Sequence, residues 1–196
     1  MDFFVNDEKI DVTLENEQTI GDVLKSFEMT CEQNDAAVIG ICVDNEKITA
    51  ESFDAVSLKP LAADTKFEFT MITKQAVFDS FKKLAVLFTE LAARMETIPV
   101  ELQTGRDQQA NAAIKNLADS IEEFCHIAAL ASLFEGYTNI AVDGKPFNEF
   151  FADFSPVLSD FEQALKSNDT VSIGDLAEYE ICPRLLAIAK TLESIK

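Results

Sequence analysis

A glutamate and a histidine lie three residues apart in the segment Glu123-Phe124-Cys125-His126. On a helix this spacing can aim both side chains in one direction, and helical bundles use it to hold a pair of metal ions together with a second such pair and two further glutamates. His126 is the only histidine in the chain, so the second pair cannot exist. If Ile121 and Phe124 face the core, Glu123 and His126 lie on the opposite side of the helix. We therefore expect both side chains on the surface, without a metal.

Nucleophilic catalysis has equally little support. A serine or cysteine nucleophile could find a histidine base only near residue 126, and the adjacent Cys125 points about 100° away around the helix. The four cysteines (Cys31, Cys42, Cys125 and Cys182) show no paired spacing, so neither a disulfide framework nor a zinc site is expected. No glycine-rich phosphate-binding motif occurs. The sequence assigns no catalytic, cofactor-binding or metal-binding residue, and we expect a protein that is not an enzyme.

The charge of the chain restricts its partners. The 196 residues include 16 basic and 35 acidic side chains, a net charge of −19. A field of this sign repels nucleic-acid phosphates and anionic lipids, so we expect neither nucleic acid nor membrane as a partner, and a protein with a basic or amphipathic segment instead. Acidity also keeps proteins soluble and does not identify that partner. Without a signal-peptide pattern or a long apolar stretch, the expected location is cytoplasmic.

The first 73 residues change character every few positions, which is typical of mixed α/β structure. Residues 3–14 read as a hairpin around a polar turn at 6–9, and residues 20–27 carry the apolar stripe of a helix. The nearly continuous apolar run 37–43 predicts a strand that is covered on both faces. Residues 66–72 alternate as a final strand.

Three motifs in this region carry a family resemblance. Thr19-Ile20-Gly21-Asp22-Val23-Leu24 begins a helix with capping-box spacing, Val43-Asp44-Asn45-Glu46-Lys47 ends the apolar strand in a turn, and Phe67-Glu68-Phe69 lies in the last strand. The pattern resembles the β-grasp sulfur carriers of thiamin and molybdopterin synthesis, which are relatives of ubiquitin. The resemblance implies a ubiquitin-like β-grasp domain over residues 1–73.

The reaction of those carriers is not implied. They end in a free Gly-Gly tail whose carboxylate is adenylated and thiolated, whereas here the last strand continues through Thr73-Lys74-Gln75 into a helix without glycine. The resemblance therefore extends to the fold and not to the chemistry.

Residues 74–196 show helical periodicity, with large apolar side chains three or four positions apart. The first seam, on a single helix, is Val77, Phe81, Leu84, Phe88, Leu91, Met95 and Ile98; the second is Ile114, Leu117, Ile121, Phe124, Ala128 and Ala131; the third is Phe147, Phe150, Phe154, Val157, Phe161 and Leu165, after a proline at 146 suited to the first helical turn. A fourth helix is predicted to open at Ser172–Asp175 and to run to about Ser194, with a kink or a short preceding helix at Pro183.

The predicted fold class is α+β, a β-grasp domain followed by an antiparallel four-helix bundle. The bundle is similar in architecture to flagellin-export chaperones. Within it, the cluster Phe147, Phe150, Phe151, Phe154 and Phe161 is interpreted first as core, with one edge as a possible groove. The connection Glu135–Asn139 is a second place where binding residues could collect.

These observations favour a non-catalytic protein-interaction module of the adaptor or chaperone-like kind. Two alternatives stay open. One is an accessory protein that docks on a sulfur-transfer or adenylating enzyme, and the other is a self-assembling structural protein. The sequence does not rank oligomeric states.

Overall fold

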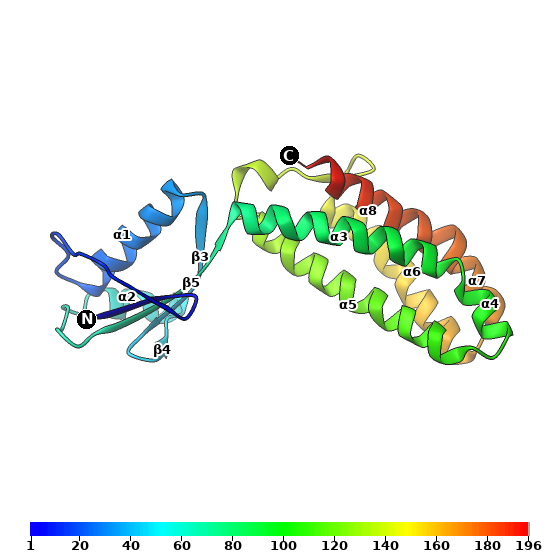
Figure 1. Ribbon diagram of the computed structural model, residues 1–196, viewed down its shortest axis with the longest axis horizontal. Coiled ribbons are helices and arrows are strands. Elements are labelled where there is room, and N and C mark those ends of the chain that lie inside the picture. The colour runs from blue at the N-terminus through cyan, green and yellow to red at the C-terminus, as the bar shows by residue number, and fades with distance from the viewer. Residues whose placement is uncertain (196) are drawn as a thin grey trace. The chain divides into compact units, whose positions relative to one another are not determined.

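The computed structural model describes residues 1–195, apart from the side chain of Asp107, and the chain divides into two compact units. Unit 1 ends at Ala76, and unit 2 begins at Val77. Unit 1 combines a sheet with two helices, and unit 2 is mostly helical (Figure 1). The mixed α+β class predicted from the sequence is confirmed.

The sheet of unit 1 has the strand order β2-β1-β5-β3-β4. Its strands are β1 (Asp2–Val5), β2 (Glu8–Ile10), β3 (Ala36–Val43), β4 (Glu46–Lys47) and β5 (Lys66–Thr73). β1 runs parallel to β5, while the pairs β1–β2, β3–β4 and β3–β5 are antiparallel. The second strand of the hairpin, predicted over residues 10–14, is displaced: Glu8 and Lys9, predicted as turn, pair with β1, and the pairing ends at Ile10.

Left-handed residues form the tight hairpin turns. The pairs Asn6-Asp7, Asp44-Asn45 and Asp143-Gly144 all have positive φ, between 49° and 78°, as the two-residue turns that match strand twist require. Asn and Asp tolerate this conformation, and glycine adopts it freely. The turns predicted at 6–9 and after Val43 are thus present, and the third pair closes a small hairpin in unit 2.

Helix α1 (Ile20–Gln33) covers one face of the sheet, where the rings of Phe27 and Phe69 stack with centroids 3.8 Å apart. Its predicted capping box is present: the Thr19 hydroxyl accepts from the Asp22 amide at 3.2 Å, and the Asp22 carboxylate accepts from the Thr19 amide at 2.9 Å. The core of unit 1 comprises Phe3, Ile20, Val23, Leu24, Val43, Val56, Phe67 and Phe69.

The prediction that β3 is covered on both faces is wrong. Most of the strand is half-buried, and Ile39 is 43% exposed. Helix α1 covers one face, whereas the other carries Phe4 and the ion pair of Lys66 and Glu68, 2.7 Å apart. Helix α2 (Ala50–Ser57) was not expected from the sequence, although Thr49 and Ser52 form a capping box at its start.

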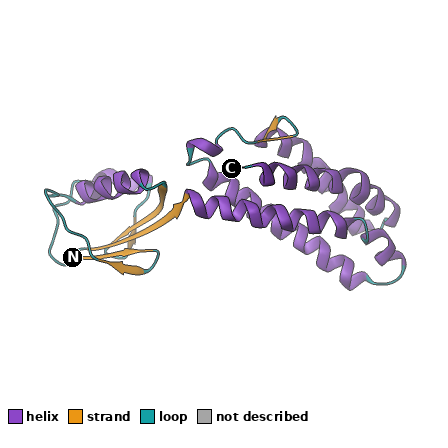
Figure 2. Cartoon of the chain, turned by 45° about the horizontal axis from the view of Figure 1, so that its top comes forward, coloured by secondary structure: helices purple, strands orange, loops and turns teal. Residues whose placement is uncertain are grey.

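In unit 2 the long helices α3 (Lys74–Met95), α5 (Asp107–Ala131), α6 (Phe147–Ser167) and α8 (Cys182–Ser194) lie alongside one another (Figures 1 and 2). They are joined by α4 (Ile98–Gln103), a 3-10 turn (Glu135–Tyr137), the hairpin of β6 (Ala141–Val142) and β7 (Lys145–Pro146), α7 (Thr170–Asp175) and a π-helical segment (Leu176–Ile181). Rings from three of the long helices meet, since Phe124 lies edge-on to Phe88 and Phe147 at 5.6 and 5.1 Å.

The predicted first seam is buried at all seven positions, but it does not lie on a single helix. Helix α3 ends at Met95, and Ile98 begins α4. The cause is Pro99, whose ring in a continuous helix would clash with the carbonyl of Met95.

The predicted second seam is correct at three of its six positions, and at the other three the buried residue is the one immediately before. Leu117, Phe124 and Ala131 are buried as expected, whereas Ile114, Ile121 and Ala128 are half-buried. The remaining buried positions are Ala110, Ala113, Ser120 and Ile127. Small side chains therefore occupy several buried positions of this helix, an arrangement that ranking residues by size does not detect.

The fourth helix begins differently from the prediction. Its cap is Asp169, whose carboxylate accepts from the Ser172 amide at 3.1 Å, so Ser172–Asp175 is not a cap. A short helix does precede Pro183, as expected. The π-helical segment then accommodates the proline: the Cys182 amide bonds the carbonyl of Ala177, five residues back. Pro146 lies just before α6 rather than within its first turn.

Candidate functional site

Glu123, Cys125 and His126 are the residues that the sequence singled out as tests for catalysis or metal binding. Glu123 and His126 are both exposed, as predicted, and burial raises the pKa of the Cys31 and Cys182 thiols, which makes them poor nucleophiles. Partial burial also raises the pKa of Cys125. Within residues 1–195, no three His, Cys, Asp or Glu side chains lie close enough together to hold a metal ion.

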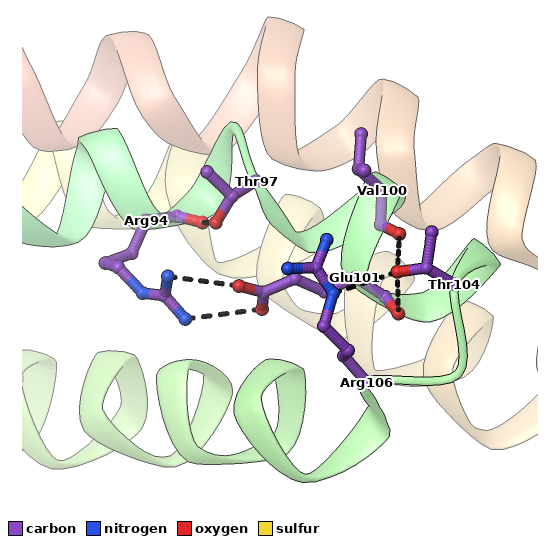
Figure 3. Close-up of polar contacts among 6 residues, drawn as sticks. All are labelled: Arg94, Thr97, Val100, Glu101, Thr104 and Arg106. Carbon is purple, nitrogen blue, oxygen red and sulfur yellow. Dashed lines mark hydrogen bonds and ion pairs between the residues drawn. The ribbon is translucent and has the colours of Figure 1, made fainter.

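Glu101 is a buried carboxylate that sequence analysis did not identify. Its side chain is 5% exposed and accepts two bonds from the Arg94 guanidinium, at 3.1 and 3.2 Å (Figure 3). The Glu101 carbonyl accepts from the Arg106 amide at 2.8 Å and from the Thr104 hydroxyl at 3.2 Å. A carboxylate fixed on both oxygens by a guanidinium is a structural link between α3 and α4.

The aromatic cluster of α6 is core. Phe150, Phe154 and Phe161 are buried, and Phe147 and Phe151 are half-buried against Phe124. The first interpretation is therefore confirmed.

The connection at 135–139 is mostly exposed, and one of its side chains points into the core. Tyr137 is buried, and its ring centroid lies 5.7 Å from that of Phe81. Of the α6 cluster, Phe150 also lines a small pocket, whose other lining side chains are mostly charged.

A pocket of about 650 Å³ does open in unit 1, between α1, α2 and β3. Its apolar lining comprises Leu24, Val38, Ile39, Ile41, Ile48, Phe53 and Phe69. Ile39 and Phe53 are 43% and 41% exposed, so apolar surface reaches the rim. The ionisable lining residues are Lys25 and Glu28, and the lining contains neither histidine nor cysteine. These residue types suit binding rather than covalent chemistry.

The pocket lies beside an unpaired strand edge. On its side away from β5, β3 pairs with β4 only at Cys42 and Val43, and the Ile48 amide bonds the Ile41 carbonyl at 2.9 Å. Along residues 36–40 no strand of the described chain pairs with that side. A bulge at Ile39 interrupts the register with β5, and the Ile39 side chain both lines the pocket and is 43% exposed. We call the pocket and this edge together the β3 groove.

Two elements position the groove. Gly21 lets α1 approach α2 closely, because a Cβ at this position would lie 2.9 Å from both the Cβ and the carbonyl oxygen of Ser57. The short β4 pairs only with Cys42 and Val43 and so leaves most of this side of β3 uncovered. Sequence analysis assigned no site residue and so missed the groove; a signal present in the sequence was the Thr49–Ser52 capping pair at the start of α2.

Among residues 1–195, no helix is both long enough and apolar enough to cross a membrane.

Comparisons with known proteins divide the chain as the structure does. A family model described as the TP0873 N-terminal domain matches residues 1–73, and one described as a domain of unknown function (DUF8042) matches residues 79–191. An uncharacterized protein of Treponema pallidum (strain Nichols) is 23% identical over 183 residues, which cover 93% of this chain and 92% of the relative. No solved structure matches. Because the second match covers more than half of the chain, the protein belongs to the DUF8042 family.

Proposed function

We propose that the protein is a non-catalytic, cytoplasmic interaction module of the adaptor or chaperone-like kind, and that unit 1 captures a protein partner in the β3 groove. The observation that carries this proposal is an apolar pocket directly beside an unpaired strand edge. An unpaired edge offers main-chain donors and acceptors to a partner, and adjacent apolar side chains offer buried area.

We also propose that unit 1 is a ubiquitin-like β-grasp domain and unit 2 a four-helix bundle. The order β2-β1-β5-β3-β4 with parallel β1 and β5 supports the first, and the four long helices support the second. Both folds host many functions, so the partner has to be found from the groove and not from the fold.

The same strand order supports a second candidate, docking on a sulfur-transfer or adenylating enzyme. Such an enzyme with ATP would then bind the chain without conjugating it. Absence of binding would exclude this candidate and leave the first unaffected.

The experiment for the first proposal is a quantitative pull-down from the native host with three versions of the full chain. Ile39→Lys places a charge in the groove. Leu58→Lys makes the same change at an apolar side chain that is 79% exposed and does not line the pocket. We expect wild type and Leu58→Lys to recover the same partner and Ile39→Lys to lose it. A partner recovered equally by all three, or by none, would contradict the proposal.

A further inference from the structure

We infer that the β3 groove binds one class of ligand: an extended polypeptide segment that pairs as an added strand with residues 36–40, apolar on the side facing the pocket and flanked by lysine or arginine. This inference rests on the proposed function and specifies the partner of the same site.

The main chain of β3 favours an extended segment over a helix. The uncovered edge is five residues long, or about 16 Å, and its outward-pointing amide and carbonyl groups can pair in register with the main chain of another strand. A bound helix satisfies its own main chain and would leave these groups without a protein partner.

The pocket supplies the side-chain preference. Val38 and Ile41 share the face of Phe69, which packs on α1. Side chains of an added strand alternate between faces, so every second one would point toward α1 and the pocket. The bulge at Ile39 disfavours pairing with any strand edge regardless of its sequence. Which segment binds is therefore decided by how well the pocket-facing side chains of that segment fit.

The charge of the surrounding elements defines the flanks. Helices α1 and α2 contain one lysine against five acidic residues, a net charge of −4, and β3 contains no charged residue. A second copy of this chain is disfavoured, because each copy carries −19, and like-charged surfaces repel at contact. A basic foreign segment is attracted by the same field.

The first experiment selects from a library of random peptides, long enough to span the edge, on the full chain. Selected peptides should have apolar residues at every second position and basic flanks, and they should bind Ile39→Lys at least about tenfold more weakly while binding Leu58→Lys normally. Peptides with apolar residues three and four positions apart, or with equal affinity for all versions, would overturn the inference. Selection of no peptide would overturn it as well.

The second experiment tests strand pairing directly. A selected peptide is synthesised with N-methyl groups on alternate amides, in the two possible registers. Since the amides of a strand point alternately to its two sides, methylation in one register should weaken binding about tenfold or more and the other should leave it nearly unchanged. Equal effects in both registers would refute strand pairing, although the pull-down could still support capture of a protein.

The charge requirement has its own matched pair. Glu28→Gln removes a carboxylate that lines the pocket, and Glu8→Gln removes one from β2 at the opposite edge of the sheet. Glu28→Gln should weaken peptide binding roughly threefold at low salt and should make the affinity depend less on salt concentration. If Glu28→Gln and Glu8→Gln bind the peptide equally, the basic flanks do not interact with the carboxylate beside the pocket.

Discussion

Replacing Arg94 with methionine should destabilise unit 2 by leaving the Glu101 carboxylate without its counter-ion. The Glu101 side chain is 5% exposed, and the Arg94 side chain is 45% exposed. Truncating one partner of a fully buried pair costs about 3–5 kcal/mol. Because Arg94 is nearly half exposed, water can reach part of the site, and we expect about 2 kcal/mol. For a unit of this size that corresponds to a fall in Tm of about 8 °C.

The assay is denaturant unfolding of the full chain followed by far-ultraviolet circular dichroism, which reports mainly on the helices of unit 2. Lys115→Met is the matched control, since Lys115 and Asp119 form an exposed pair 3.8 Å apart that should contribute at most about 0.5 kcal/mol. The double change Arg94→Met and Glu101→Leu should recover most of the loss, because it removes the unpaired charge. If Arg94→Met behaves like the control, or the double variant is no more stable than the single one, the reasoning is wrong.

Three further predictions concern the helix ends and the packing of unit 1. Lys82→Met should cost about 1 kcal/mol in denaturant unfolding, because the Lys82 ammonium donates to the carbonyl of Glu193 in the last turn of α8 at 2.6 Å and to that of Ile195, just after the helix, at 3.0 Å; an unchanged unfolding midpoint would contradict this. Gly21→Ala should destabilise unit 1 by roughly 1–2 kcal/mol, because the new methyl group meets α2 at 2.9 Å, and it should speed amide exchange in α1. Backbone amides of Gln18 and Thr19 hold the pKa of Asp22 below its ordinary value, so this cap stabilises above the ordinary aspartate pKa and weakens as the pH falls through the lowered one. The protection factors of the α1 amides, which correct for the intrinsic pH dependence of exchange, should therefore fall in acid for wild type, whereas those of Asp22→Asn should show little such dependence.

Local features of the fold were predictable where chemistry at single positions determines conformation. The turn at Asn6-Asp7 and the cap at Thr19 depend on side-chain types that few alternatives can replace. The seam from Val77 to Met95 was predictable because large apolar side chains recur alternately four and three positions apart along nearly the whole of α3.

Features that depend on neighbouring elements were not predictable. The buried stripe of α5 includes Ala113 and Ser120, and side chains this small do not mark a core-facing stripe in the sequence. The π-helical segment before Pro183 is an adjustment of hydrogen bonding that no local residue type specifies.

The candidate site was missed for the same reason. A run such as residues 37–43 reads as fully buried, yet its burial depends on how far β4 extends, and β4 covers only two of its residues. The exposed position of Phe53 requires α2, whose eight residues show too little periodicity for confident assignment.

The central claim is that the β3 groove is occupied by a polypeptide in the cell. Photo-crosslinking from a benzophenone amino acid at position 53, compared with position 58 on the neighbouring surface, tests it most directly. Both native side chains are exposed, and only Phe53 lines the pocket. We predict a specific crosslink from position 53 to an apolar segment of one host protein with basic flanks, and none from position 58. Equal crosslinking from both positions, or no protein crosslink from position 53, would contradict the account.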